Sequence, residues 1–350
     1  MPKKVLFFGI YDKKYSRTRV LQNGFTRNGW IVEECHIDPR KNRNVLKYVK
    51  LAWLGFKARR TKHDLVIVGF PAHTVTWLAR LIFGHDIVVD VFLSLYDTNV
   101  VDRKLYTGAS LQGRKDKFLD RWCCVLARNV LVDTKTLGAY FAEFVGVPRE
   151  KIIPVPIGAD DAIFFPSNQS EDEMFTVHFH GTFIPLQGVS HIVEAAHILR
   201  DEDVRFRIIG SGQDAPRVDK QIAELGLTNV ERIPKVPVEQ IPGYLARAHI
   251  VLGIFGDAER GKRAVTNKVY EAMAMGKAII TMDCKGMREL PDPEKAFVLV
   301  PAADPQSIVA AVLALRQDDL RRRELGRNAR AMFENFFLPE RIVENLLAEL

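Results

Sequence analysis

The chain has 350 residues, 47% hydrophobic and 27% charged, a composition that indicates a folded protein of two ordinary domains and excludes a disordered one. No apolar run approaches the roughly 18 residues of a spanning helix, and the four cysteines lack the CxxC spacing of a zinc site, so we expect reduced thiols in a cytoplasmic protein. The net charge of +7 is uneven, because residues 1–165 hold 27 Lys and Arg against 16 Asp and Glu (+11), and the remainder 23 against 27 (−4).

Short β-rich runs alternate with helical runs in the first half, which predicts βαβ units and a parallel sheet. The predicted strands cover Val5–Phe8, Ile31–Cys35, Leu65–Val68, Ile87–Phe92, Asn129–Val132 and Ile152–Val155. The predicted helices include Arg17–Asn28, Thr74–Phe83, Asp116–Ala127 and Lys135–Phe144.

A basic amphipathic helix is predicted over Val45–Arg60. Its apolar residues at helical spacing are Leu46, Val49, Trp53 and Phe56, and they are flanked by Lys47, Lys50, Lys57, Arg59 and Arg60. This pattern suits a helix lying on an anionic membrane surface, which would place the protein peripherally on the inner face of a membrane. The alternative is a domain helix whose apolar face belongs to the core.

The alternating pattern restarts after a polar, acidic segment, Ser167–Glu173. The predicted strands of the second half are Phe175–His180, Arg205–Ile209, Val230–Ile233, Ile250–Ile254, Ala278–Met282 and Phe297–Val300. Its predicted helices include Val189–Arg200, Arg217–Leu225, Ile241–Arg247, Pro305–Gln317 and Asp319–Phe336, and Pro339 then opens a short helix to Leu350. Two consecutive open α/β units imply a cleft, with ligands outside the carboxyl ends of strands.

A short predicted helix near residue 270 carries a lone carboxylate, Glu271. Asn267 is predicted as its N-cap and Gly276 as its C′ residue. Glu271 is not the partner of a capping box, because position 268 holds Lys instead of Ser or Thr. Lys268 and Glu271 share one helix face, which suits a ligand with a diphosphate and a sugar hydroxyl. The alternative is a solvated surface ion pair.

Three glycine-bounded or polar loops follow predicted strands of the second half: Gly181–Gly188, Gly210–Gly212 and Val265–Glu271. Glycine lets backbone N–H groups approach an anion, and a helix N-terminus adds positive potential. Any one such loop can be plain turn geometry. Three of them at one edge of one sheet favour an anion-binding site.

Several segments together resemble a known family. They are VDTKTLGAYFAEFVGVPREKIIPVPIGADDAIFFP (Val132–Pro166), the GTFIPLQG loop, and the strands VRFRIIGSG and AHIVLGIF, followed by NKVYEAMAMGKAII. Over nearly its whole length the chain is similar to the retaining GT-B-fold glycosyltransferases of the "glycosyl transferases group 1" class (family 4 type), in a subgroup with an NK-x-Y-E helix start.

The resemblance implies an α/β protein of two Rossmann-like parallel-sheet domains facing a central cleft. Residues 1–160 would bind the acceptor, residues 161–336 the nucleotide sugar, and the helix 337–350 would return to the N-terminal domain. It also implies donor-site roles for ten positions: Gly181, Thr182, Gln187, Gly210, Gly212, Val236, Thr266, Asn267, Lys268 and Glu271.

Within that site Gly181 and the residues after it would cradle the diphosphate, Glu271 would hydrogen-bond the ribose, and Val236 would meet the base. The chain departs from the family pattern at Thr182 and Gln187, where an Arg and a Lys are common. It also has Arg263 where a first Glu often lies, eight residues before Glu271. We expect Lys268 to replace one lost cation.

On the acceptor side the candidates are Gly9, Arg17, Arg19 and His73, with Asp97 and Asp102 joining Lys268 as candidate catalytic groups. Simpler interpretations are solvated arginines, a core histidine and loop carboxylates that face water. Residues 201–203 (DED) form a DxD pattern, but they precede a predicted strand and would face away from the cleft, so we expect no metal site.

The sequence therefore predicts a metal-independent, retaining transferase in polysaccharide biosynthesis. A nucleotide-diphosphate sugar, with UDP favoured, would be its co-substrate, and no other cofactor is expected. The acceptor would be a saccharide or a lipid-linked molecule. A GT-B-fold nucleotide-sugar epimerase is the alternative. A dehydrogenase is disfavoured because the first strand ends FGIYDKKY without GxGxxG, and nucleic-acid binding is suggested only by the pI of 9.2.

Overall fold

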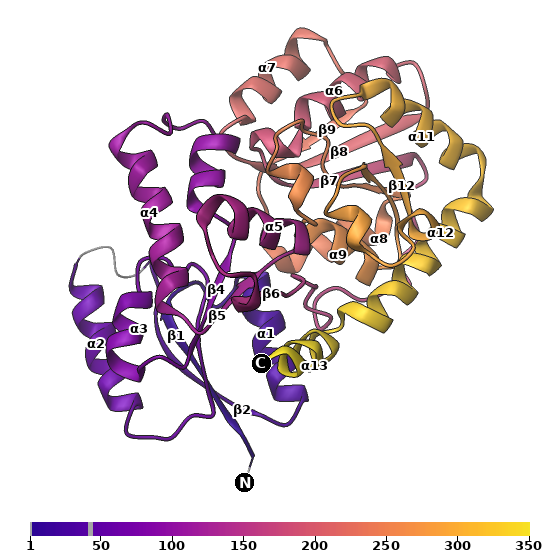
Figure 1. The fold of residues 1–350 in the computed structure, drawn as a ribbon. Coiled ribbons are helices and arrows are strands. Elements are labelled where there is room, and N and C mark those ends of the chain that lie inside the picture. The colour runs from indigo at the N-terminus through magenta and orange to yellow at the C-terminus, as the bar shows by residue number, and fades with distance from the viewer. Residues whose placement is uncertain (1, 41–44) are drawn as a thin grey trace. The chain divides into compact units, whose positions relative to one another are not determined.

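The computed structural model describes residues 2–40 and 45–350. The chain divides into two units, one formed by Met1–Gly158 with Leu338–Leu350 and the other by Ala159–Phe337. Each unit is built on one six-stranded sheet in which neighbouring strands run parallel (Figure 1). Among the described residues, no helix combines the length and apolar character needed to cross a membrane.

The first sheet has the strand order β2-β1-β3-β4-β5-β6. Its strands are β1 Lys4–Ile10, β2 Ile31–Ile37, β3 Leu65–Val68, β4 Ile87–Phe92, β5 Asn129–Val132 and β6 Ile152–Pro154. All six predicted strands are confirmed to within two residues at either end. These strands could be recognised in the sequence because helices cover both faces of a parallel sheet. Strands such as β4 are therefore apolar almost throughout and fully buried.

The helices of the first unit cover the two faces of this sheet. They are α1 Ser16–Arg27, α2 Leu46–Ala58, α3 Thr76–Phe83, α4 Leu111–Leu126, α5 Lys135–Tyr140 and α13 Pro339–Glu349, with shorter turns η1 Asp97–Asp102, η2 Phe141–Val145 and η3 Arg149–Lys151. The helices α2 to α5 pack on one face and α1 and α13 on the other (Figure 1). α4 begins five residues before its predicted start, because Ser110 caps it by accepting the Gly113 N–H at 3.0 Å.

The closing helix α13 is part of the first unit's core. Its residues Ile342, Val343 and Leu346 are buried against α1. Gly24 of α1 allows this close approach, since a Cβ there would lie 2.2 Å from the carbonyl oxygen of Pro339. A side chain at position 24 would therefore push the two helices apart.

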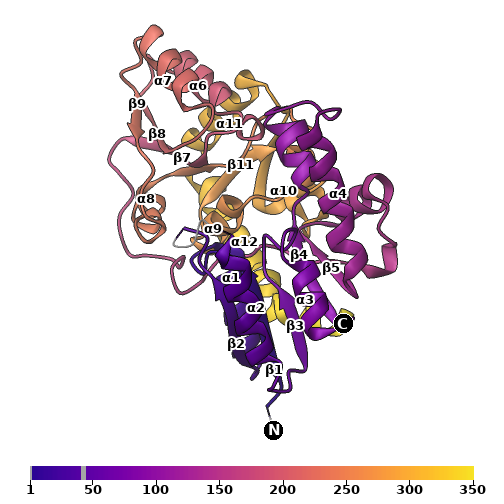
Figure 2. The ribbon, with the colours of Figure 1, turned by 90° about the vertical axis from the view of Figure 1, so that its left-hand side faces the viewer.

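The second sheet has the strand order β12-β11-β10-β7-β8-β9. Its strands are β7 Phe175–Thr182, β8 Val204–Ser211, β9 Val230–Ile233, β10 Ile250–Leu252, β11 Ala278–Met282 and β12 Phe297–Val300. Its helices are α6 Val189–Ile198, α7 Ala215–Glu224, α8 Ile241–Arg247, α9 Asn267–Ala274, α10 Pro293–Ala296, α11 Pro305–Gln317 and α12 Asp319–Met332, with turns η4 Pro185–Gln187, η5 Val238–Gln240, η6 Gly261–Arg263, η7 Met287–Glu289 and η8 Phe333–Phe337. In Figure 2, α6, α7 and α11 lie on one face of this sheet and α8 and α9 on the other.

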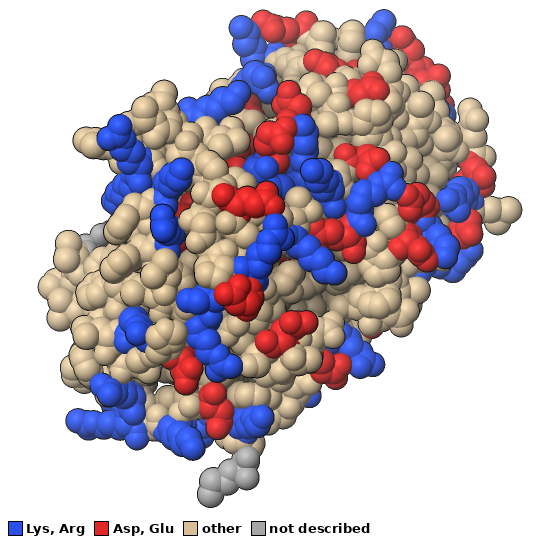
Figure 3. Space-filling model, viewed as in Figure 1, with Lys and Arg blue, Asp and Glu red and all other residues tan. Residues whose placement is uncertain are grey.

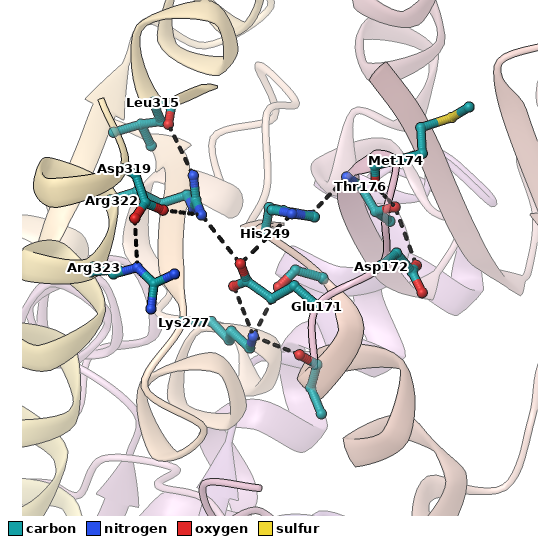
Figure 4. Close-up of polar contacts among 12 residues, drawn as sticks. Glu171, Asp172, Met174, Thr176, His249, Lys277, Leu315, Asp319, Arg322 and Arg323 are labelled. Carbon is teal, nitrogen blue, oxygen red and sulfur yellow. Dashed lines mark hydrogen bonds and ion pairs between the residues drawn. The ribbon is translucent and has the colours of Figure 1, made fainter. Parts of the chain in front are cut away.

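The polar segment Ser167–Glu173 is anchored to the second unit. Figure 4 shows Glu171 at the centre of a cluster in which it accepts from Lys277 Nζ at 3.3 Å and Arg322 Nη2 at 3.2 Å. His249 Nε2 lies 3.7 Å from the same carboxylate. Burial lowers the pKa of Lys277, and the charge of Glu171 opposes this shift. Glu171 thus fixes the segment by neutralising two largely buried cations.

Replacing Glu171 with Ala is expected to destabilise the second unit by about 1–2 kcal/mol, because Lys277 and Arg322 would lose a charged acceptor that is itself partly exposed. For a domain of this size the thermal midpoint would fall by roughly 2–8 °C. Differential scanning calorimetry measures this shift. Glu173→Ala is the matched control, since Glu173 is exposed and lies two residues further along, and an equal loss there would contradict the assignment.

Candidate functional site

Three loops meet at one edge of the second sheet. They follow β7, β8 and β10, which are neighbouring parallel strands, so their carboxyl ends lie together. Backbone hydrogen bonds join the loops: the Phe183 N–H donates to Ser211 O at 2.9 Å, and the Phe255 N–H donates to Gln187 O at 3.1 Å. Gly188 is required at its position, because its φ is +63° and a Cβ would lie 2.4 Å from the backbone nitrogen of Gly256.

The helix α9 follows the third loop and is almost wholly buried. Its N-cap is Thr266, which has extended backbone angles, and Asn267 is the first helical residue, so the predicted N-cap was wrong by one position. Its end is as predicted: Gly276 has a φ of +66° and donates to Met273 O, while Lys277 N–H donates to Ala272 O. This pair of hydrogen bonds is a Schellman motif, and it aims the chain back into β11.

Lys268 lies inside the unit, with 4% of its surface exposed. Its ammonium donates a hydrogen bond to Gln187 Oε1, lies 4.0 Å from the centre of the Phe179 ring, and would be 3.0 Å from a Cβ placed on Gly181. Burial lowers the pKa of Lys268 to about 7, and the nearby Glu271 carboxylate opposes this shift. The ammonium thus lies beside Gly181 and Gln187 at the carboxyl end of β7.

The Glu271 carboxylate, 6% exposed, closes a chain of three buried polar side chains. Its Oε2 lies 2.7 Å from His180 Nε2, and His180 Nδ1 lies 3.0 Å from His178 Nε2. An ionised carboxylate only accepts, so His180 donates through Nε2–H and, when neutral, accepts at Nδ1 from His178. Burial lowers the pKa of His178 well below its usual value, with the charges of His180, Arg207 and Lys268 acting in the same direction. The predicted alternative of a solvated Lys268–Glu271 surface pair was therefore wrong.

Sequence reasoning assigned no role to His178 and His180, although the signal was present. The two histidines are two residues apart on β7, so they point to the same face of the sheet. Such a pair in an otherwise apolar strand predicts a buried polar network on that face. The partner, Glu271, is 91 residues away in the chain and could not be identified by spacing.

The remaining donor-site candidates lie at the same sheet edge at different depths. Gly210 pairs with Gly181 in the β7–β8 register, Thr182 is exposed, and Gly212 follows β8 directly. Val236 is half-buried and follows β9, the edge strand, so β8 separates its strand from β7. Gly181, Gln187, Lys268 and the Glu271 helix are therefore brought into one cluster, with Val236 further along the edge.

In the first unit Arg17 is completely buried, which rules out the solvated interpretation of this residue. Its Nε donates to both oxygens of Asp90, at 2.8 and 2.7 Å, and its Nη1 donates to Val155 O at 2.8 Å. Burial raises the pKa of Asp90, and the Arg17 charge opposes this shift. The ion pair joins α1 to β4 beneath the carboxyl edge of the first sheet.

Three further candidates of the first unit are also buried. His73 Nε2 lies 3.2 Å from Asp120 Oδ1, and Asp120, absent from the sequence-based candidates, also accepts from Ser94 Oγ at 2.6 Å. Asp97 and Asp102, at 1% and 0% exposure, lie in η1. The expectation that these loop carboxylates face water was therefore wrong, and their burial favours a structural role over direct contact with an acceptor.

Closer to the edge of the first sheet, Gly9 lies within β1 and Arg19 is half-buried in α1. Three aromatic rings gather there: Phe70 lies 5.4 Å from Tyr15 and 5.0 Å from Phe92, measured between ring centroids. They follow or end β1, β3 and β4, which are neighbours in the sheet. Sequence reasoning missed this aromatic cluster because its members come from three separate segments.

The DxD pattern at residues 201–203 precedes β8 and therefore lies at the amino end of the sheet, as predicted. Arg316 binds two of its carboxylates, with Nη1 2.8 Å from Glu202 Oε2 and Nη2 3.8 Å from Asp203 Oδ2. Residues 2–40 and 45–350 contain no group of three or more His, Cys, Asp or Glu side chains that could hold a metal ion.

Two parallel six-stranded sheets with flanking helices are shared with solved glycosyltransferase structures. The chain superposes on Anabaena HepE in complex with UDP-glucose with a TM-score of 0.72 and 16% identity, covering 99% of both chains. Sucrose-phosphate synthase from Thermosynechococcus elongatus gives a TM-score of 0.72 and 16% identity, covering 99% of this chain and 98% of that chain. At these identities the likeness shows the fold, which is the GT-B fold of two Rossmann-like domains, as predicted.

Residues 175–318, within the second unit, match the family model described as "Glycosyl transferases group 1". The putative colanic acid biosynthesis glycosyl transferase WcaI of Escherichia coli is 27% identical over 192 residues, 48% of this chain and 46% of that protein. The MMP alpha-(1->4)-mannosyltransferase of Mycolicibacterium hassiacum is 27% identical over 190 residues, 53% of this chain and 44% of that protein. The chain thus spans a little under half the length of these curated relatives, and the matches support the group 1 family.

Proposed function

We propose that the protein is a retaining, metal-independent glycosyltransferase whose second unit binds a nucleotide-diphosphate sugar, most simply a UDP-sugar. The observation that carries this proposal is the burial of Lys268 and Glu271 on one helix beside Gly181, at the edge where three loops meet. A buried cation and a buried carboxylate suit the diphosphate and the sugar hydroxyls of such a donor. The solved structure of HepE with UDP-glucose and the group 1 match support the donor class.

In this proposal Glu271, oriented by His180, accepts hydrogen bonds from the ribose hydroxyls. Lys268 supplies the positive charge for the diphosphate, because its ammonium reaches Gln187, the position at which the family often has a lysine. The N-terminus of α6, which starts after Gly188, adds backbone N–H donors. Together these groups stabilise the negative charge that develops on the leaving diphosphate.

The first unit is proposed to bind the acceptor, which is a saccharide or a lipid-linked molecule. The aromatic cluster of Tyr15, Phe70 and Phe92 at its carboxyl sheet edge is a candidate surface for a sugar ring. Relatives named for colanic acid and amylovoran biosynthesis support a saccharide acceptor.

A thermal-shift panel with UDP, GDP, ADP, TDP and NAD tests the donor site. A ligand at 100 times its dissociation constant should stabilise the protein by about 2.7 kcal/mol. We expect a shift with one nucleoside diphosphate, lost in Glu271→Ala and in the isosteric Glu271→Gln. Glu259→Ala, which removes an exposed carboxylate from the loop between β10 and α9, is the control and should keep the shift. A shift with NAD alone, or one that survives Glu271→Gln, would overturn the proposal.

A further inference from the structure

The apolar residues predicted on the helix α2 do not face the core. Leu46, Val49, Trp53 and Phe56 are 66%, 64%, 63% and 50% exposed. The core contact of this helix is made instead by Leu51 and its neighbours on the opposite face. The alternative of a domain helix with a buried apolar stripe is therefore excluded for these four side chains.

The two neighbouring helices, α3 and α4, also carry exposed apolar side chains. α3 packs between α2 and α4 on the same face of the first sheet. Trp77 and Leu81, one turn apart on α3, are 45% and 65% exposed. Phe118 and Trp122, one turn apart on α4, are 58% and 41% exposed, and their rings stack with centroids 5.7 Å apart. We call the exposed faces of these three helices the α2–α4 surface.

The charge of the α2–α4 surface has one sign. The three helices contain eight Lys and Arg residues but only two acidic residues, Asp116 and Asp120, which are both buried. In Figure 3 the side of the first unit that carries these helices shows uncharged surface bordered by Lys and Arg, with few acidic side chains. Three of the four tryptophans of the chain lie on this surface.

We propose that the α2–α4 surface docks the first unit onto an anionic phospholipid bilayer, with the three helices lying in the plane of the interface. Exposed Trp and Leu side chains fit the boundary between headgroups and acyl chains, and the surrounding Lys and Arg fit anionic headgroups. A second copy of the chain is a poor occupant, because two such surfaces would bring like charges together. Nucleic acid also binds beside exposed aromatic and basic side chains, but the aliphatic Leu46, Val49 and Leu81 favour lipid.

Flotation of the full chain with vesicles tests this proposal independently of any transfer activity. We expect binding to vesicles of phosphatidylcholine with phosphatidylglycerol, and little binding to phosphatidylcholine alone. Trp53→Glu, Trp77→Glu and Trp122→Glu, one change on each helix, should each lower the bound fraction by about tenfold. Leu320→Glu is the matched control, since Leu320 is 80% exposed on α12 in the second unit, and it should bind as the unaltered chain does.

Tryptophan fluorescence gives a second readout in the same samples. Emission should shift to shorter wavelength on vesicle addition and be quenched by brominated lipid, and each Trp→Glu change should reduce both effects while the unfolding midpoint stays unchanged. If only Trp53→Glu lowers vesicle binding, then α2 alone contacts the lipid, and the three-helix proposal is overturned. Self-association without lipid, or tighter binding to a single-stranded oligonucleotide than to vesicles, would overturn the choice of partner.

Discussion

Asp90→Asn is expected to destabilise the first unit by about 3–5 kcal/mol, the usual cost of leaving a buried charge without its partner. The substitution would leave the Arg17 guanidinium, which is completely buried and always protonated, without its carboxylate. For a domain of this size the thermal midpoint would fall by roughly 6–20 °C. Calorimetry of the purified variant measures both quantities.

Arg17→Met tests the same pair from the other side and adds a pH signature. Without Arg17, only the smaller effect of His73 would oppose burial, so the folded-state pKa of Asp90 would rise further above the unfolded value. A carboxyl with a raised folded-state pKa stabilises the fold when protonated, and that stability is lost as the pH rises through the window above the unfolded value. Stability should therefore fall more steeply with rising pH in Arg17→Met than in the unaltered chain.

The double variant Arg17→Met/Asp90→Asn is the control for both single changes. It removes both charges together, so its loss of stability should be smaller than the sum of the two single losses. Additive losses would mean that the two side chains do not interact in solution as they do in the structure.

Lys268→Met is expected to lower kcat/KM for the nucleotide-sugar donor by roughly 10²–10³-fold, if Lys268 stabilises the leaving diphosphate as proposed. Because burial lowers the pKa of Lys268 to about 7, the free enzyme loses this positive charge as the pH rises above that value. The profile of kcat/KM against pH should therefore fall by about tenfold per pH unit on its alkaline side. A bound diphosphate would raise the pKa, so kcat should fall only at higher pH.

Lys268→Arg separates this effect from unfolding, because Arg stays protonated and should remove the alkaline fall in kcat/KM.

The lowered pKa of Lys268 also means that the folded state binds fewer protons than the unfolded chain between pH 7 and the ordinary lysine range. Lys268 therefore favours folding more as the pH rises, and its titration does not explain alkaline inactivation by unfolding. An alkaline fall that persists unchanged in Lys268→Arg would contradict the role of this residue.

The strands and most helices could be predicted because their signals are local. β1 to β12 were found from apolar runs between turn residues, and α9 from the pairing of a capping position with Gly276. The errors also have local causes. α4 starts early because Ser110 is a cap within a polar segment, and α10, with four residues, is too short to show a helical period.

The burial of the candidate site could not be predicted in the same way. Arg17 was predicted to face an acceptor or to be solvated, because its partner, Asp90, lies 73 residues away in the chain. The contact between His180 and Glu271, which are 91 residues apart, was missed for the same reason. By contrast, the pattern on α2 placed Trp53 on an apolar stripe, but only the structure shows that this stripe is exposed and that Leu51, on the opposite face, contacts the core. Sequence pattern identifies a stripe, and packing decides which stripe is buried.

The packing of α13 on α1 has a consequence for the order in which the protein forms during synthesis. The second unit is continuous, so every residue of its core has left the ribosome once Phe337 has emerged. The first unit must wait for Ile342, Val343 and Leu346, although its six strands were made long before. During that interval one face of the first sheet lacks its closing helix, so the half of the protein that is synthesised first completes its folding last.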